Sequence, residues 1–176
     1  MSKTKLRIHT WPEKILRKKC KKIKVVDDSI RSQLSEMLTL MRVTDGFGLA
    51  GNQAGLDASL IVVGIEDSVF KLVNPKIIKR EGSISFPEGC LSFPGLEMEV
   101  KRDNKILISA LNENGKKVEI EVEGVLSVIF QHEIDHIEGK VFIDRVSFLK
   151  RLQIAPKLAA ITRRTRNVLR KQEKKH

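Results

Sequence analysis

The feature that most constrains the fold is one strongly apolar stretch that ends in a cluster of ionisable side chains. Residues 125–130 read Val-Leu-Ser-Val-Ile-Phe, and residues 132–136 read His-Glu-Ile-Asp-His. We predict a helix over residues 125–138 that is apolar around most of its circumference and ends at Gly139. Such a helix belongs in the centre of a fold, where polar side chains without partners cost free energy. The histidines and the glutamate therefore need a buried partner, and a metal ion suits them.

Two histidines in this stretch, His132 and His136, stand four residues apart. Side chains at i and i+4 project from the same face of a helix, so both rings can bind one cation. Glu133 adjoins the first histidine and can act as a base on a water molecule that the metal holds. The three residues therefore predict the metal centre of a hydrolase.

A catalytic metal usually has three protein ligands and one open position, so a third ligand has to be found. His9 and His176 lie near the chain ends on basic segments and are poor candidates. Asp144, downstream of the helix, would complete a set like that of metallopeptidases. Cys90 lies in the tight turn expected between two prolines, and a thiolate is a strong ligand for Zn²⁺ or Fe²⁺. The residues alone leave both Asp144 and Cys90 open, and we favour Cys90.

The bulk properties are those of one ordinary globular domain. The chain has 176 residues, of which 41% are hydrophobic and 31% charged, and this composition is typical of soluble proteins. No apolar run approaches the roughly 18 residues of a membrane helix, and no signal peptide is visible. With two cysteines we expect separate thiols, with Cys20 on the surface and without a chemical role. We therefore expect a cytoplasmic protein with no membrane partner; an organelle matrix is the second choice.

The remaining patterns predict an α+β fold. A first helix is expected to begin near Ser29, capped by Asp28 or by Ser29 itself. Strands are expected at residues 59–65, around residue 73, at 104–110 and at 117–122, with a hairpin turn at 112–115. Helices and antiparallel strands that are segregated in this way predict antiparallel β-sheets packed around the central helix.

The two ends of the chain are basic. Residues 1–24 and residues 147–176 each carry a net charge of +9, whereas residues 25–146 carry −7. The chain after Asp144 is predicted to form a basic helix, with a break or a fresh start at Pro156. Its narrow apolar stripe consists of Leu158, Ile161, Thr165 and Val168. A charged tail of this kind suggests a polyanionic partner.

Three segments together resemble the signature motifs of peptide deformylases, in the same order. They are residues 46–53 (Gly-Phe-Gly-Leu-Ala-Gly-Asn-Gln), 88–92 (Glu-Gly-Cys-Leu-Ser) and 131–136 (Gln-His-Glu-Ile-Asp-His). Shorter segments that also look like the family are Pro12, Leu16-Arg17, residues 73–75 and residues 142–145. The resemblance covers about residues 8–153. We take residues 1–153 as a deformylase-like catalytic domain and residues 154–176 as a basic helical extension.

The first motif departs from the family pattern at two positions. Gly51 stands where alanine is common, and Asn52 stands where proline or threonine is frequent. Because glycine is conformationally permissive, we expect Gly51 to loosen the loop that carries Gln53. This departure bears on catalytic efficiency rather than on reaction type, since every ligand and proton-transfer position is kept.

The resemblance implies removal of the N-formyl group from the N-terminal formylmethionine of newly made polypeptides, with release of formate. It implies one divalent cation, Fe²⁺ in the cell with Zn²⁺, Ni²⁺ or Co²⁺ as alternatives, bound by Cys90, His132 and His136. Glu133 would move the protons. The Gln53 side chain and the backbone N–H of Leu91 would stabilise the oxyanion.

The resemblance and residue positions also suggest contacts around the substrate. Gly48 is similar to a backbone position that pairs with the substrate chain. The candidates to line an apolar slot for the methionine side chain are Phe47, Val128 and Ile129, for which a plain core role is the alternative. Glu88 and Arg102 match family positions and would form an ion pair that steadies the cysteine turn.

Two other functions are compatible with these residues. A zincin-like peptidase would use the same histidines with a carboxylate or a third histidine, and Cys90 would be dispensable. A binding module would hold RNA through its basic ends, and its metal site would be either structural or a degenerate relic. Ribosomal RNA is the polyanion that we expect at the C-terminal extension, because formylated peptides emerge from ribosomes. Residues 157–176 contain no aromatic side chain, which argues against base stacking.

Overall fold

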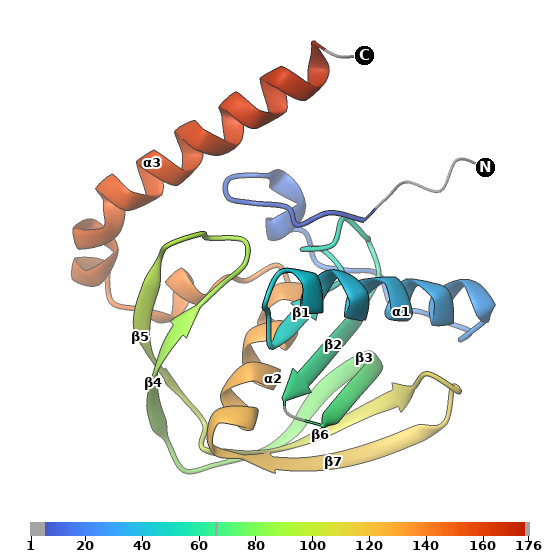
Figure 1. Cartoon of the computed structure of the whole chain (residues 1–176). Helices are drawn as coiled ribbons and strands as arrows, with labels where there is room; N and C mark the ends of the chain where they lie inside the picture. The colour runs from blue at the N-terminus through green and yellow to red at the C-terminus, as the bar shows by residue number, and fades with distance from the viewer. Residues whose placement is uncertain (1–5, 66, 175–176) are drawn as a thin grey trace.

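A computed structural model of the chain describes residues 6–65 and 67–174. Helices are combined with antiparallel strands, as the sequence predicts (Figure 1). The helices are α1 Asp28–Val43, α2 Gly124–Ile137 and α3 Phe148–Glu173, with short 3-10 helices η1 Lys14–Arg17 and η2 Phe142–Arg145. The strands are β1 Gly48–Ala50, β2 Leu60–Ile65, β3 Ser68–Glu81, β4 Ile84–Gly89, β5 Glu97–Arg102, β6 Lys105–Asn112 and β7 Lys117–Glu123.

These strands form two antiparallel sheets. One sheet has the strand order β1-β2-β3-β6-β7, and β4 pairs with β5 in a separate hairpin. The predicted turn joins β6 to β7, and Gly115 adopts a φ of +74° there. The Asn112 side chain accepts hydrogen bonds from the backbone N–H groups of Asn114 and Lys116. The turn chemistry therefore accounts for the register of this hairpin.

Helix α2 occupies the centre of the molecule, between the five-stranded sheet and the β4–β5 hairpin (Figure 1). Ten of its residues are buried, polar ones among them. Phe130, Ile134 and Ile137 pack against side chains of the large sheet in one core cluster. The predicted central position of this helix is confirmed. The fold thus brings ionisable side chains into an apolar interior.

The β4–β5 hairpin was not anticipated. The turn expected around Cys90, between Pro87 and Pro94, is present, since the Phe93 N–H donates to the Cys90 carbonyl at 2.9 Å, but the strands beside it were not predicted. In the structure Pro87 lies within β4, opposite Glu99 of β5. Proline is tolerated there because each strand of a two-stranded sheet has one edge that needs no N–H donor.

Two predictions near the N-terminus were wrong. Helix α1 is capped by Asp27, whose carboxylate accepts a hydrogen bond from the Ile30 N–H at 2.9 Å, so the helix begins one residue earlier than expected. Cys20 is buried rather than exposed. Its backbone N–H donates to the carbonyl of Ile137, which turns the thiol inward while the lysines beside it face solvent. Burial raises the pKa of the Cys20 thiol to about 11, which makes it unreactive.

The loop after β1 is packed tightly, contrary to the expectation from Gly51. The Gly51 N–H donates to the carbonyl of Leu60 at 2.9 Å, and its own carbonyl accepts from the Leu56 N–H at 2.8 Å. A Cβ atom at residue 51 would lie 2.2 Å from the carbonyl oxygen of Ala58. Glycine is required because another part of the backbone passes too close for any side chain. The loop that carries Gln53 is therefore held in place.

Helix α3 is continuous, and the predicted break at Pro156 does not occur. Pro156 lies on the exposed side of the helix, where loss of one backbone hydrogen bond is cheapest. The residues that face the body of the protein are Ile154, Leu158, Ile161 and Thr165. Val168, which we placed in this stripe, is 48% exposed because the last turns extend beyond the body. None of the described helices is both long and apolar enough to cross a bilayer.

Candidate metal centre and active site

Three side chains that can bind a metal converge beside α2. The Sγ atom of Cys90, which follows β4, lies 3.3 Å from Nε2 of His136. The ring centroids of His132 and His136 are 4.9 Å apart. One ligand atom from each of the three residues lies within 4.8 Å of the others, and no other such group occurs among residues 6–65 and 67–174. A thiolate and two imidazoles can therefore bind one cation here.

The other candidates for the third ligand lie elsewhere. Nδ1 of His9 is 2.7 Å from the carboxylate of Glu13. The carboxylate of Asp144 is paired with the guanidinium of Arg17. His176 lies outside the described residues. In the described part of the chain, no ligand set of the zincin type is assembled.

The two buried imidazoles have opposite electrostatic environments. Burial alone lowers the pKa of His132, but its interactions with Cys90 and with the Glu88 carboxylate more than offset it and raise that pKa above its ordinary value. Burial, followed by the charge of His132, lowers the pKa of His136. Nδ1 of His132 is 2.7 Å from Oε2 of Glu88 and is thereby turned away from the cysteine. This contact leaves Nε2 of His132 facing Cys90 and His136.

Glu133 is a buried carboxylate that faces a cleft also lined by Cys90 and His132. Its Oε2 atom has no hydrogen-bond partner among the described residues. Burial raises the pKa of Glu133 to about 7, with Glu88 acting in the same direction. Gly48 lies against this carboxylate, since a Cβ atom at residue 48 would be 2.4 Å from Oε1 of Glu133. Glu133 can therefore exchange a proton near neutral pH.

Gln53 and Leu91 are the two candidate donors to the oxyanion, and both line the cleft beside Cys90. The side-chain oxygen of Gln53, Oε1, accepts a hydrogen bond from the Ala50 N–H at 2.8 Å, which fixes the side-chain amide. Its Nε2 atom is 3.4 Å from Sγ of Cys90 and 3.3 Å from Oγ of Ser92. Leu91 lines the same cleft as Gln53. The Gln53 amide donor is thus aimed at the site.

The cleft has a volume of about 700 Å³. It contains the four candidate substrate-binding positions named from the sequence, namely Phe47, Gly48, Val128 and Ile129. Phe47 is 65% exposed, whereas Val128 is buried. Val128 therefore forms part of the wall and Phe47 part of the rim.

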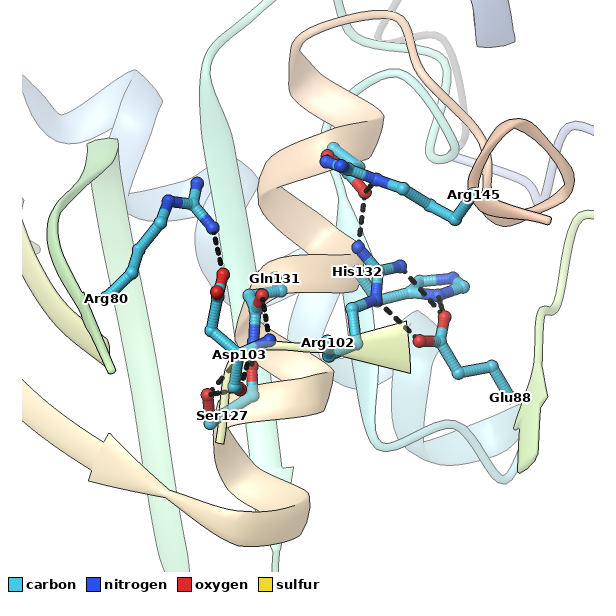
Figure 2. A network of polar contacts seen from close by, with 9 residues as sticks. Arg80, Glu88, Arg102, Asp103, Ser127, Gln131, His132 and Arg145 are labelled. Atoms are coloured by element: carbon cyan, nitrogen blue, oxygen red, sulfur yellow. Dashed lines mark hydrogen bonds and ion pairs between the residues drawn. The ribbon is translucent and has the colours of Figure 1, made fainter. Parts of the chain in front are cut away.

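A buried network of ion pairs leads to His132 through Glu88 (Figure 2). Arg102 contacts both carboxylate oxygens of Glu88, at 2.6 and 2.9 Å, and also Oδ2 of Asp135 at 2.5 Å. Arg145 binds Asp135 from the other side. Burial raises the pKa values of Glu88 and Asp135, but their guanidinium partners more than offset it and hold both below their ordinary range. Both carboxylates are therefore charged.

Comparisons with known proteins agree with this geometry. The model of the family described as polypeptide deformylase matches residues 5–152. A peptide deformylase of Aquifex aeolicus is 41% identical over 147 residues, which cover 80% of this chain and 87% of the relative. The chain belongs to the polypeptide deformylase family.

Solved structures support the same assignment. A peptide deformylase from Legionella pneumophila has a TM-score of 0.83 at 38% identity, over 89% of this chain and 95% of that one. A plant peptide deformylase has a TM-score of 0.88 at 36% identity, over 93% and 92% of the two chains. The mixed helix and antiparallel-sheet architecture is therefore the deformylase fold.

The site of this deformylase family member fits a divalent cation. The donor set of one thiolate and two imidazoles suits Zn²⁺, Fe²⁺, Ni²⁺ or Co²⁺. The Glu133 oxygen without a partner points to the same conclusion, because a buried carboxylate alone is costly and a nearby cation offsets that cost.

Sequence reasoning missed three polar residues around this deformylase site. Asn52 is buried, and its side-chain N–H donates to the backbone carbonyl of His136. Asp135 and Arg145 complete the network around Arg102. Asn52 was noted only as a departure from the family pattern. Asp135 gave a signal, because a carboxylate inside an apolar helix requires a counter-charge. Nothing in the sequence identifies Arg145 as that partner.

The raised pKa of Glu133 predicts how the metal-free protein responds to pH. Its protonated form contributes stability that is fully present below about pH 4.5 and is lost as the pH rises through about 7. A Glu133→Gln variant has no carboxyl group to ionise at this position, so its stability does not fall in this pH range for that reason. Relative to wild type, its free energy of unfolding should therefore rise by roughly 2 to 3 kcal/mol between pH 5 and pH 8. Urea unfolding in the presence of a chelator measures the free energies of unfolding of the variant and of wild type at each pH. If the difference between the two proteins did not change with pH, the prediction would be contradicted.

Proposed function

We propose that this chain hydrolyses the N-formyl group of N-terminal formylmethionine on new polypeptides and releases formate. One observation carries the proposal: Cys90, His132 and His136 converge beside a buried carboxylate, Glu133, one oxygen of which has no hydrogen-bond partner in the described part of the chain. Cys90, His132 and Glu133 line one cleft. The family assignment supports the same reaction. We further propose the cytoplasm as its location, in keeping with its bacterial relatives.

In this proposal, Cys90, His132 and His136 hold the cation. When bound, the cation polarises the formyl carbonyl and lowers the pKa of the attacking water. We propose Fe²⁺ in the cell, with Zn²⁺, Ni²⁺ or Co²⁺ able to replace it, because the mixed thiolate and imidazole set accepts all four. Glu88, held by Arg102, orients the His132 ring.

Glu133 carries the proton transfers. Its carboxylate takes a proton from the attacking water and returns it to the amine nitrogen as the C–N bond breaks, so that formate and a free amino group are formed. Burial raises the pKa of Glu133 in the metal-free protein, and the charge of a bound cation acts in the opposite direction, which favours the carboxylate form that accepts the proton. The Gln53 side-chain N–H and the Leu91 backbone N–H donate to the oxyanion that develops on the formyl oxygen.

The substrate chain binds along β1. This strand is the first in the sheet order, so an extended peptide can pair with its outer edge through the backbone at Gly48. Val128 and Ile129 line a slot for the methionine side chain, with Phe47 at its rim. The formyl carbon carries only hydrogen, so a narrow space beside the cation excludes an acetyl group.

The reaction is tested by anaerobic measurement of formate release from formyl-Met and acetyl-Met peptides. Wild type should act on the formyl peptide alone. Glu133→Gln should keep its metal but lose about 10²- to 10⁴-fold in turnover, because it cannot accept a proton. Cys90→Ser should lose bound metal. Undiminished metal content and activity in Cys90→Ser would contradict the ligand set, and cleavage of internal peptide bonds by wild type would favour a peptidase.

We also propose that the basic face of α3 binds ribosomal RNA, and that residues 154–176 act as an extension of the catalytic domain. Helix α3 contacts the body through one stripe, which leaves its arginines free to face a partner. The exposed arginines in the part of the helix after Pro156 are Arg163, Arg164, Arg166 and Arg170. Such clustered cations bind phosphates by releasing counterions.

Replacing these four arginines with glutamine should weaken ribosome binding and lower the salt dependence of the affinity. The slope of log K against log salt should fall by about one for each phosphate that the variant no longer binds. The matched control replaces four exposed lysines of the other basic end, namely Lys14, Lys19, Lys22 and Lys24. Equal affinities for the two variants at every salt concentration would contradict a role for α3.

A further inference from the structure

A chain of ion pairs runs from the surface at η2 to the buried ring of His132 (Figure 2). Arg145 is 39% exposed and donates to both carboxylate oxygens of Asp135. Arg102, only 2% exposed, bridges Asp135 and Glu88. Oε2 of Glu88 then contacts Nδ1 of His132 at 2.7 Å. Every link is a direct contact, and the last one sets the orientation of a ligand ring.

Charge balance gives Arg145 a role beyond local packing. Two guanidinium groups face two carboxylates in this network. Without Arg145, one buried guanidinium would face both carboxylates, and an uncompensated buried charge is costly. Arg102 holds Glu88 through Nε and Nη2 and Asp135 through Nη1. If Arg145 were removed, Asp135 would have Arg102 as its one remaining guanidinium partner in this network. Asp135 would then attract Arg102 more strongly and draw it away from Glu88.

We propose that Arg145 is a positioning residue for the ligand His132, acting through Asp135, Arg102 and Glu88. The inference rests on the metal site of the proposed function. Arg145 does not line the cleft, so it contacts neither the substrate nor the cation. Its effect is to keep Arg102 centred between two carboxylates, so that Glu88 holds the imidazole in the orientation that binds metal.

The chain offers a matched control for this inference. Arg17 contacts both carboxylate oxygens of Asp144, the residue next to Arg145, and is 40% exposed. The two arginines thus make the same kind of ion pair on the same side of the molecule. Asp144 connects to the Val141 backbone rather than to a ligand. Arg17→Gln therefore removes a bidentate arginine–aspartate pair that has no contact with Asp135, Arg102 or Glu88.

The experiment measures how fast a chelator removes zinc from the zinc-loaded full-length chain. Arg145→Gln should release zinc about tenfold faster than wild type, because loss of a group that orients a ligand typically weakens metal binding by 10- to 100-fold. Arg17→Gln should release zinc at the wild-type rate. In steady-state assays Arg145→Gln should lower kcat and leave KM unchanged, since Arg145 lies outside the cleft.

A second variant separates positioning from a structural role. The double variant Asp135→Asn with Arg145→Gln removes the Asp135 carboxylate as well as the Arg145 guanidinium. Arg102 then faces Glu88 alone, so the charges balance again, and the rate of zinc release should return toward that of wild type. The inference is overturned if Arg145→Gln and Arg17→Gln release zinc equally fast, or if the double variant is no slower than Arg145→Gln. A wild-type protein that binds no zinc would instead overturn the proposed function, and the inference with it.

Discussion

The structure depends on one unusual demand: helix α2 must bury its ionisable side chains inside an apolar core. His132, Glu133, Asp135 and His136 are all buried on this helix. Each would be costly there alone, so each needs a compensating neighbour. Glu88 compensates His132, and two arginines compensate Asp135. The histidine rings and Glu133 are left for a cation, which is why the centre of this fold is also its site.

The two sheets contribute different parts of that site. The β4–β5 hairpin supplies Glu88 and Arg102 from its strands and Cys90 from the turn that follows β4. The large sheet supplies the edge strand β1 and the loop that carries Gln53. Asn52 joins that loop to the end of α2 through the carbonyl of His136. Cys90, Gln53 and strand β1 thus come from separate elements, which are brought together by α2 and by the contact between Gln53 and Cys90.

The sequence was informative where local chemistry and spacing determine geometry. Histidines four residues apart on an apolar helix must share a face, and the Asn112–Gly115 segment has the residues of a hairpin turn. It was uninformative where long-range packing decides. Pro87 argued for a loop but lies in a strand, and Gly51 argued for mobility but fills a space too small for a side chain. Arg145 could be linked to the site only by tertiary contact.

The proposed chemistry requires the Cys90 thiolate and two imidazoles to converge on one ion. X-ray absorption at the zinc edge of the zinc-loaded protein tests it most directly. The account predicts one zinc per chain with one sulfur at about 2.3 Å and two imidazole nitrogens at about 2.0 Å. A coordination shell made of nitrogen and oxygen alone, with no sulfur, would contradict it.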